Sequence, residues 1–338
     1  MANSEIIDEW ILAGDLGGTK TLLELTRAGA NVPGFARRYA VAEYDGFRGM
    51  LHHFIGEFTG EAGSAPRIVA ACIAVAGAVE NGRARVTNLP WELDAAEIAG
   101  EFAIERVRLV NDFEAAAWGL DGLDPTDLQV LQHGQPQARS NRVVLGAGTG
   151  FGVAYSLWAE HGRVVVAGEG GHAGFAPRDE LQCRLWRVLH ERVDDVTTGD
   201  VLSGPGLERI YEFLQHESAN KTIESTTGMR APAIAELASQ GDPGAAAALH
   251  LFARIFGAVA GDHALTVIAR GGVYIAGGIA PKILPHLAAP GFVEAFHNKR
   301  AHARLMERFP VFVVRNERIG LLGAQCIART LICVKPLP

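Results

Sequence analysis

The sequence predicts an α/β fold built from two domains. The chain has 338 residues, of which 48% are hydrophobic, and at about 150 residues per domain this length suggests two domains with sizeable cores. Apolar runs of strand length alternate with helix-forming segments. Residues 10–25 and 142–155 repeat one design, in which an apolar strand, a glycine turn with a threonine and a second apolar strand follow one another. This repetition predicts two similar halves.

The first of these hairpins offers three polar functions. Asp15 could hold a metal-bound water, and the amides of Gly17, Gly18 and Thr19 could hold phosphate oxygens because glycines let backbone N–H groups converge on an anion. The alternative is a plain hairpin turn with Gly-Gly at its tip. Neither the Walker A spacing nor G-x-G-x-x-G is present.

The segments that follow continue the alternation of helices and strands. Helical spacing and apolar runs predict, in order, a helix at 47–58, a buried strand at 67–77, a loop at 87–91 and a helix at 94–102. His52 and His53 are adjacent in the first helix and point to different faces, as one surface and one core residue, which disfavours a shared metal.

Residues 107–118 read as a strand that ends in Asn111 and Asp112 and continues directly into a helix. Open α/β sheets bind ligands at such strand ends, where a carboxylate can act as a general base on a hydroxyl. A competing interpretation is structural, since Asn111 with Glu114 three residues later satisfies a helix capping box.

The second glycine hairpin follows a polar connection at residues 121–139. Its turn contains Gly148, Thr149 and Gly150, which predicts a second phosphate-binding turn opposite the first across a shared cleft.

A short strand at 163–166 precedes a glycine-rich loop with Glu169 and His172. These two side chains could hydrogen-bond a polyhydroxylated ligand. Two alternatives remain: a satisfied loop histidine, and a zinc site, which the lack of a cysteine-rich partner disfavours.

The rest of the chain is mainly helical. The expected elements are helices at 181–190, 231–237, 244–269 and 319–332 and strands at 272–276 and 311–314, with Ser203 as a helix cap and Pro205 as an early helical residue. Residues 245–260 approach membrane-span length but contain His250 and Arg254, which indicates a buried helix. Gly277 and Gly278 follow a strand and could lie against the base and ribose of a nucleotide.

Composition limits the partners and the compartment. A net charge of −7 without a basic run argues against a nucleic-acid surface, and no stretch reads as a membrane span. The N-terminal residues are acidic and do not form a secretory signal. Four scattered cysteines indicate reduced thiols and a cytoplasmic protein. Forty glycines in tight clusters suggest that backbone approaches a ligand.

Taken together, these motifs resemble those of bacterial glucokinases of the hexokinase type, within the actin/Hsp70/sugar-kinase superfamily. The segments that carry the resemblance occur in family order: 14–19, 87–88 with Trp91, 111–113, 146–150, 168–172 with 175–177, 201–206 and 276–278. The cysteine cluster that binds zinc in ROK-family kinases is missing, which favours the non-ROK branch.

The resemblance implies ribonuclease-H-like (actin-like ATPase) domains around a central cleft, with residues 10–112 and 319–335 in the small domain and 113–318 in the large one. It also implies a homodimer and ATP- and Mg²⁺-dependent phosphorylation of glucose or a close hexose at the 6-hydroxyl. The alternative is a non-catalytic or weakly active paralogue that senses sugar or nucleotide.

The same resemblance implies a role for each motif. Asp112 would be the general base, while Asn111, Glu169 and His172 would hold the sugar. Asp15 would lie near the magnesium ion. The nucleotide residues would be Gly17, Gly18, Thr19, Gly148, Thr149 and Gly150 at the phosphates and Gly277 and Gly278 near the adenosine.

Two positions depart from the family pattern. A further sugar-binding glutamate of the family is replaced by Gly199, with Asp200 beside it, and a position that is often acidic is Gly174. We therefore expect ATP binding with weakened glucose binding, unless the Asp200 side chain turns inward or the true sugar is different.

Overall fold

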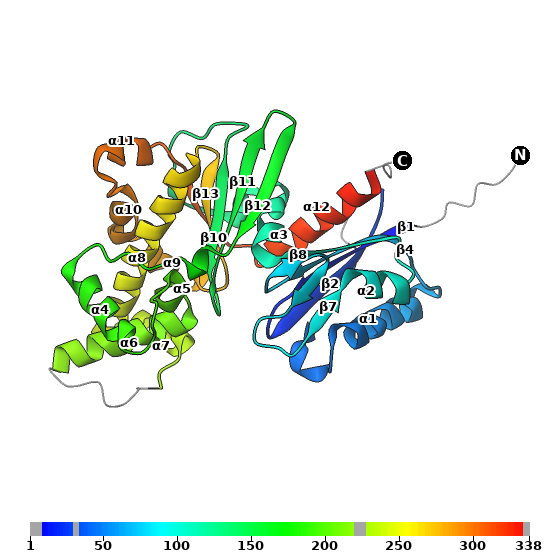
Figure 1. The fold of residues 1–338 in the computed structure, drawn as a ribbon, viewed down its shortest axis with the longest axis horizontal. Coiled ribbons are helices and arrows are strands. Elements are labelled where there is room, and N and C mark those ends of the chain that lie inside the picture. The colour runs from blue at the N-terminus through cyan, green and yellow to red at the C-terminus, as the bar shows by residue number, and fades with distance from the viewer. Residues whose placement is uncertain (1–8, 30–33, 220–227, 334–338) are drawn as a thin grey trace, which may run out of the picture. The chain divides into compact units, whose positions relative to one another are not determined.

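The computed structural model describes residues 9–29, 34–219 and 228–333, which fold into two compact units (Figure 1). Unit 1 comprises Met1–Leu123 and Arg318–Pro338, and unit 2 comprises Asp124–Glu317. Each unit combines a mixed sheet with helices. Helix α3 lies in unit 1 rather than with the later residues, because it packs against the C-terminal helix α12.

Unit 1 is built on a five-stranded sheet with the order β3-β2-β1-β4-β8. Its strands are β1 (Glu9–Leu16), β2 (Lys20–Arg27), β3 (Phe35–Ala40), β4 (Arg67–Val75) and β8 (Arg106–Asn111). The first three pair antiparallel, whereas β4 and β8 run parallel to β1. A small second sheet contains β5 (Val79–Glu80), β6 (Arg83–Arg85) and β7 (Glu92–Asp94).

Helices cover both faces of the main sheet in unit 1. They are α1 (Phe47–Ala62), α2 (Ala95–Glu101), α3 (Asp112–Gly119) and α12 (Ile319–Cys333), with 3-10 turns η1 (Val41–Glu43) and η2 (Leu120–Gly122). Alternate residues of a strand point to opposite faces. Leu12 accordingly joins a core with Phe54 of α1, while Ala13 joins a second core with Ala324 of α12.

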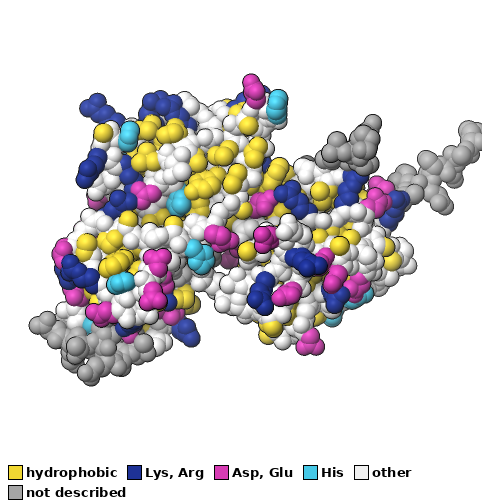
Figure 2. Space-filling view, viewed as in Figure 1, with side chains coloured by type: hydrophobic (Ala, Val, Ile, Leu, Met, Phe, Trp, Pro, Cys, Tyr) yellow, Lys and Arg dark blue, Asp and Glu magenta, His cyan; other side chains and the backbone are white. Residues whose placement is uncertain are grey.

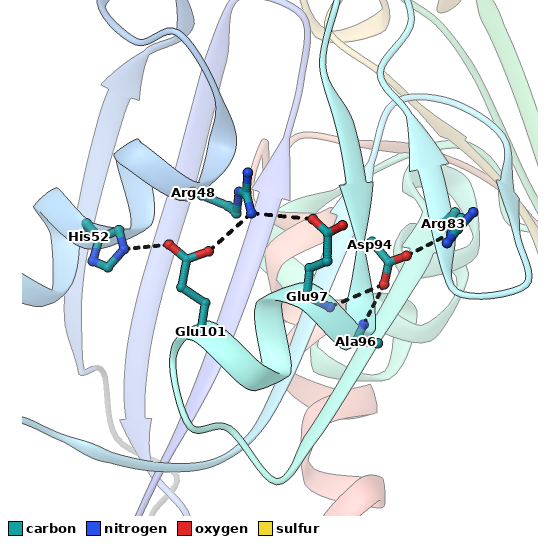
Figure 3. Close-up of polar contacts among 7 residues, drawn as sticks. All are labelled: Arg48, His52, Arg83, Asp94, Ala96, Glu97 and Glu101. Carbon is teal, nitrogen blue, oxygen red and sulfur yellow. Dashed lines mark hydrogen bonds and ion pairs between the residues drawn. The ribbon is translucent and has the colours of Figure 1, made fainter.

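A polar network joins α1 to α2 on the surface of unit 1 (Figure 3). The Asp94 carboxylate caps α2 by accepting the amides of Ala96 at 2.8 Å and Glu97 at 3.3 Å, and Arg83 donates to it at 2.8 Å. Glu101, at the end of α2, accepts from His52 at 2.7 Å and from Arg48 at 3.4 Å.

Unit 2 repeats the strand order of unit 1 and adds one strand. Its sheet has the order β12-β11-β10-β13-β14-β9. The strands are β9 (Leu128–Gln132), β10 (Arg142–Ala147), β11 (Phe151–Ala159), β12 (Gly162–Gly168), β13 (Gly272–Ala276) and β14 (Val311–Val314). As in unit 1, three antiparallel strands are followed by two parallel strands. The predicted two similar halves are therefore confirmed.

The helices of unit 2 surround α8 (Pro243–Val267). They are α4 (Glu180–His190), α5 (Thr198–Val201), α6 (Gly204–Ala219), α7 (Ala231–Ser239), α9 (Leu284–Leu287), α10 (Pro290–His297) and α11 (Ala303–Met306), with 3-10 turns η3 (Pro125–Asp127), η4 (Gly170–His172), η5 (Ala280–Ile283) and η6 (Arg300–His302). Helix α8 is long and apolar enough to span a bilayer by length and composition, but most of its apolar window is buried in the core of unit 2. The predicted buried helix is confirmed.

The structure differs from the expected fold in three details. Residues 121–139 contain strand β9, which pairs antiparallel with β14 at the sheet edge, so they are more than a polar connection. Strand β3 and the small sheet were not anticipated. His52 and His53 do contact different partners, but both side chains are exposed and neither is a core residue.

Candidate active site

In unit 1, the predicted polar residues lie at the carboxyl-terminal end of the parallel strands. Strands β1, β4 and β8 are parallel neighbours, so their carboxyl ends lie side by side. The register pairs Asp15 with Ala74 and Ala74 with Val110. With strands about 4.8 Å apart, Asp15 lies roughly 10 Å from the end of β8. Asn111 is the last residue of β8, and Asp112 follows it as the first residue of α3.

Asn111 is firmly tied to its surroundings. Its Oδ1 accepts the amides of Phe113 at 2.9 Å and Glu114 at 3.3 Å, and its Nδ2 donates to the Gly77 carbonyl at 3.2 Å. Asn111 is therefore the N-cap of α3. The reciprocal half of the expected capping box does not form, because Arg108 donates to the Glu114 carboxylate at 2.7 Å.

Asp112 is the first residue of α3 and is half-buried. Its Oδ1 accepts the amide of Phe113 at 2.9 Å. A carboxylate in the first turn of a helix is stabilised in its ionised form by the helix dipole, which is the form that a general base requires.

Asp15 lies beneath the N-terminus of α12. A Cβ added to Gly320 would stand 2.9 Å from Asp15 Oδ2, so only glycine allows this approach. Burial raises the pKa of Asp15 to about 6, against the opposing effect of Lys20. Gly320 is a residue whose part in the site the sequence did not reveal. Its signal was the spacing of Gly320 and Gly323 in a predicted helix, two glycines three residues apart, which marks a face of close approach.

The two glycine turns each have three residues between their strands and are closed by different hydrogen bonds. In the β1–β2 turn the Gly17 amide donates to the Lys20 carbonyl at 3.1 Å, and in the β10–β11 turn the Gly148 amide donates to the Gly150 carbonyl at 2.8 Å. The first glycine of each turn is half-buried, and the next two residues are exposed. Because the amides of Gly17 and Gly148 close their turns, the tips offer the amides of Gly18 and Thr19, and of Thr149 and Gly150.

The second turn is joined to a helix start. The Gly204 amide, at the beginning of α6, donates to the Gly148 carbonyl at 2.8 Å. Ser203 Oγ accepts the Gly206 amide at 3.0 Å, which confirms Ser203 as a cap and Pro205 as an early helical residue. Helix N-termini favour anions, so α6 adds to the positive potential at this turn.

Gly277 and Gly278 follow β13, at the same edge as the second turn. Gly277 adopts φ +84° and lies against the Ala147 carbonyl, where a Cβ would stand 2.6 Å away. Gly278 has open space around its Cα. Packing within unit 2 therefore explains Gly277, whereas Gly278 leaves room for a ligand.

Glu169 and His172 are exposed at the two ends of η4, after β12. The His172 amide donates to the Glu169 carbonyl at 3.0 Å. Gly171 between them is buried, and a Cβ there would meet the Phe151 carbonyl at 2.1 Å. The loop backbone therefore lies directly on β11 and directs both side chains outward.

Gly199 and Asp200 border the same loop. A Cβ on Gly199 would stand 3.2 Å from the Gly171 carbonyl. The Asp200 carboxylate accepts from the Thr197 amide at 2.9 Å and from Arg209 at 3.1 Å. It is thus committed to the start of α5 and to α6, and it does not supply the missing acidic group at position 199.

Among the described residues, no three His, Cys, Asp or Glu side chains come close enough to hold a metal ion together. Each unit does place its predicted residues along one sheet edge. Unit 1 offers Asp15, the first turn, Asn111 and Asp112, and unit 2 offers the second turn, Glu169, His172, Gly277 and Gly278.

Comparison with known proteins shows the family to which the chain belongs. A family model described as "Glucokinase" matches residues 12–331. A glucokinase of Synechocystis sp. is 38% identical, with 94% of this chain and 97% of the relative covered. The crystal structure of a glucokinase from an Antarctic psychrotroph superposes with a TM-score of 0.82 at 30% identity and covers 95% of this chain and 99% of that one.

More distant structures share the fold. A ROK-family glucokinase from Streptomyces griseus, solved with glucose and AMPPNP, gives a TM-score of 0.60 at 20% identity and covers 95% of this chain and 99% of that chain. The predicted α/β, actin-like ATPase fold class is confirmed. On the family match and the relatives' identity over nearly the whole chain, this protein belongs to the glucokinase family.

Proposed function

We propose that the protein phosphorylates glucose at the 6-hydroxyl with ATP, giving glucose 6-phosphate and ADP. Family membership supports this reaction. The observation that carries it is the Asp112 carboxylate at the end of β8 and the start of α3, next to Asn111, whose amide is fixed by the cap and by Gly77. Phosphoryl transfer requires mainly positioning, charge neutralisation and one carboxylate on the nucleophile.

Asp112 accepts the proton of the sugar 6-hydroxyl as its oxygen attacks the γ-phosphorus of ATP. Asn111 holds a neighbouring hydroxyl with the N–H that it does not donate to Gly77, and Glu169 and His172 hold the remaining hydroxyls. An in-line arrangement of the attacking and leaving oxygens provides most of the rate.

The two glycine turns bind the phosphates through backbone amides. Gly18 and Thr19 serve from unit 1 and Thr149 and Gly150 from unit 2, while Gly17 and Gly148 shape the turns. Gly277 and Gly278 lie near the adenosine. An AMPPNP-bound relative with this fold is consistent with ATP as the donor.

Asp15 fits a magnesium ion. It supplies carboxylate oxygens, which magnesium prefers, directly or through water. Its raised pKa reflects a partly desolvated carboxylate that a cation would stabilise in the ionised form. When bound, magnesium would neutralise charge on the ATP phosphates. Asp15 is the residue that we assign to hold it.

The remaining expectations are part of the same proposal. We assign units 1 and 2 as the small and large domains of a non-ROK glucokinase in the cytoplasm. The scattered cysteines support the branch and the compartment.

We also assign a homodimer. Edge strand β12 exposes Val164 by 50% and Val166 by 43%, and Figure 2 shows hydrophobic side chains gathered over this part of unit 2. A second copy of the chain would bury them. Light scattering should give the mass of a dimer for the wild type and of a monomer for Val166→Glu; a wild-type monomer would refute this assignment.

An ADP-release assay over a panel of hexoses tests the reaction. We expect turnover with glucose or a close hexose, and a loss of about 10²- to 10⁴-fold in kcat for Asp112→Asn, with ATP binding retained in calorimetry. Binding of sugar and nucleotide without turnover on any hexose would instead identify a sensor and refute the proposal.

A further inference from the structure

The loop that carries Glu169 and His172 rests on unusual support. Gly170 and Gly171, between the two side chains, pack inward, so the backbone of η4 determines where both side chains point. Gly171 lies on the Phe151 carbonyl of β11. A Cβ on Gly170 would meet Val153 Cγ2 at 2.9 Å and the Cε1 atom of His263 at 3.2 Å. A histidine ring from α8 therefore forms part of the floor beneath the loop.

His263 is itself held by β11. The Tyr155 hydroxyl and His263 Nδ1 lie 2.7 Å apart in a hydrogen bond, and the two rings are inclined at 50°. Tyr155 is two residues after Val153, so both side chains point to the same face of the sheet. Val153, Tyr155 and His263 form one packed surface under Gly170.

Both members of the pair are neutral near pH 7. Burial raises the pKa of Tyr155 and lowers that of His263, against the opposing effect of Asp262. A neutral phenol and a neutral imidazole can share one hydrogen bond without the cost of a buried charge. The pair is thus a rigid polar contact inside the unit.

We propose that Tyr155 and His263 are positioning residues that fix the Glu169–His172 loop from behind and thereby determine the affinity for the sugar. This inference rests on the proposed function, in which Glu169 and His172 hold the sugar hydroxyls. Neither Tyr155 nor His263 has to touch the substrate. Removing the imidazole leaves a void under Gly170, the loop samples more conformations, and the two side chains must be ordered on binding.

A second histidine pair, at the opposite edge strand of the same sheet, provides a matched control for the Tyr155–His263 pair. His297 Nε2 pairs with Gln132 Oε1 of β9, and burial likewise lowers the pKa of His297. Strands β12 and β9 are the two edges of the sheet, so this second pair is remote from the loop. His263→Ala and His297→Ala each remove a partly buried, hydrogen-bonded imidazole, and only the first supports η4.

The His263 and His297 variants should differ in their Michaelis constants for glucose and ATP. For His263→Ala we expect the glucose KM to rise about tenfold, since small displacements of positioning groups cost up to about a hundredfold, while the ATP KM stays within about twofold. Tyr155→Phe keeps the ring and should give a smaller rise, and His263→Gln, which retains hydrogen-bonding capacity, should recover part of the affinity. His297→Ala should lower the melting temperature without separating the two constants. Equal changes in the two KM values for His263→Ala, or the same glucose KM shift in both alanine variants, would overturn the proposal.

Hydrogen exchange separates a failure of this inference from a failure of the proposed function. Amides of residues 169–173 should exchange faster in His263→Ala than in the wild type and His297→Ala, whatever sugar the enzyme uses. Faster exchange without turnover of any hexose would retain the loop support and refute the kinase assignment. Unchanged exchange at these amides would refute the loop support itself.

Discussion

The sheets of units 1 and 2 share a strand order. At the carboxyl-terminal ends of their parallel strands, however, the two units place their polar groups by different means. In unit 1 the carboxyl-terminal end of the sheet presents carboxylates: Asp112 starts one helix, and Asp15 is half-buried under the start of another. In unit 2 the backbone itself is closely packed at this end of the sheet, because Gly171 and Gly277 lie against neighbouring carbonyls. One topology thus places its polar groups through helix starts in unit 1 and through close backbone packing in unit 2. The difference predicts which substitutions each unit tolerates.

The largest effect should come from the backbone of unit 2. Gly171→Ala forces a Cβ to within 2.1 Å of the Phe151 carbonyl, so η4 must move. We expect kcat/KM for glucose to fall about a hundredfold or more. Gly174→Ala is the control, since the space around that exposed glycine is open. If steady-state kinetics find equal losses for both variants, close packing of Gly171 is not what orders the loop.

In unit 1 the expected effect on stability depends on the charge of the Asp15 carboxylate. The folded protein raises the pKa of Asp15 from 3.8 to about 6, so between these values the unfolded state binds fewer protons and stability falls as the pH rises. The penalty is absent below about pH 4 and complete above about pH 6. Asp15→Asn should therefore be more stable than the wild type at pH 8, by at most about 3 kcal/mol, and equal to it near pH 4.

Urea unfolding from pH 4 to pH 8, in EDTA to exclude divalent cations, measures this difference. The variant should also lose most of its activity, because a neutral amide cannot replace the carboxylate that we propose as the magnesium ligand. A stability difference that is constant over the pH range would show that the Asp15 carboxylate is not penalised in the folded protein.

Unit 1 also contains one close backbone contact at its site, where Gly320 of α12 lies against the Asp15 carboxylate. Gly320→Ala places a methyl group 2.9 Å from Asp15 Oδ2, and the carboxylate must shift. We expect kcat to fall about tenfold with an unchanged glucose KM. Gly56→Ala, in open space on α1, should instead leave activity intact and stabilise the helix slightly. Wild-type kcat in Gly320→Ala would refute the positional role.

The smallest effect should lie away from the site residues of both units, in the network of Figure 3. Asp94→Ala removes the cap of α2 and the contact with Arg83. The melting temperature should fall by about 2–4 °C, and both Michaelis constants should stay unchanged. The hydrogen bond from Arg83 and the amides of α2 lower the pKa of Asp94, so this loss should begin to shrink as the pH falls below the ordinary value of 3.8 and should vanish only below the lowered pKa of the folded protein. Scanning calorimetry at pH 7 and pH 3 checks both points, with Arg83→Ala as a milder control.

Much of the fold was predictable because its strands are apolar and buried. Residues 311–314 form β14 as expected, and the closing helix begins at Ile319. Strand β9 was not predicted, because edge strands can be polar. Its last residue, Gln132, uses its side-chain amide to donate to the carbonyls of Met306 and Phe309. Hydrophobic periodicity does not report such a strand.

The sequence predicted where the candidate site residues lie along the strands and helices, but not which backbone groups pack against them. The sequence indicated that Asn111 and Asp112 follow a strand, and the capping role of Asn111 is confirmed. Clustered glycines were interpreted as backbone approaching a ligand, whereas Gly146 and Gly277 are required by carbonyls of adjacent strands. Such contacts join residues far apart in the chain, so local patterns cannot reveal them.

The discontinuity of unit 1 has a consequence for biosynthesis. Helix α12 contributes Leu321, Ala324 and Ile327 to one core of unit 1 and covers Asp15, yet the ribosome makes it after the whole of unit 2. Until then one face of the first sheet is covered only in part, by α3, and its remaining apolar surface is exposed to chaperones and to aggregation in the nascent chain. The packing around Asp15 should therefore be completed late in translation, after the larger unit has already emerged.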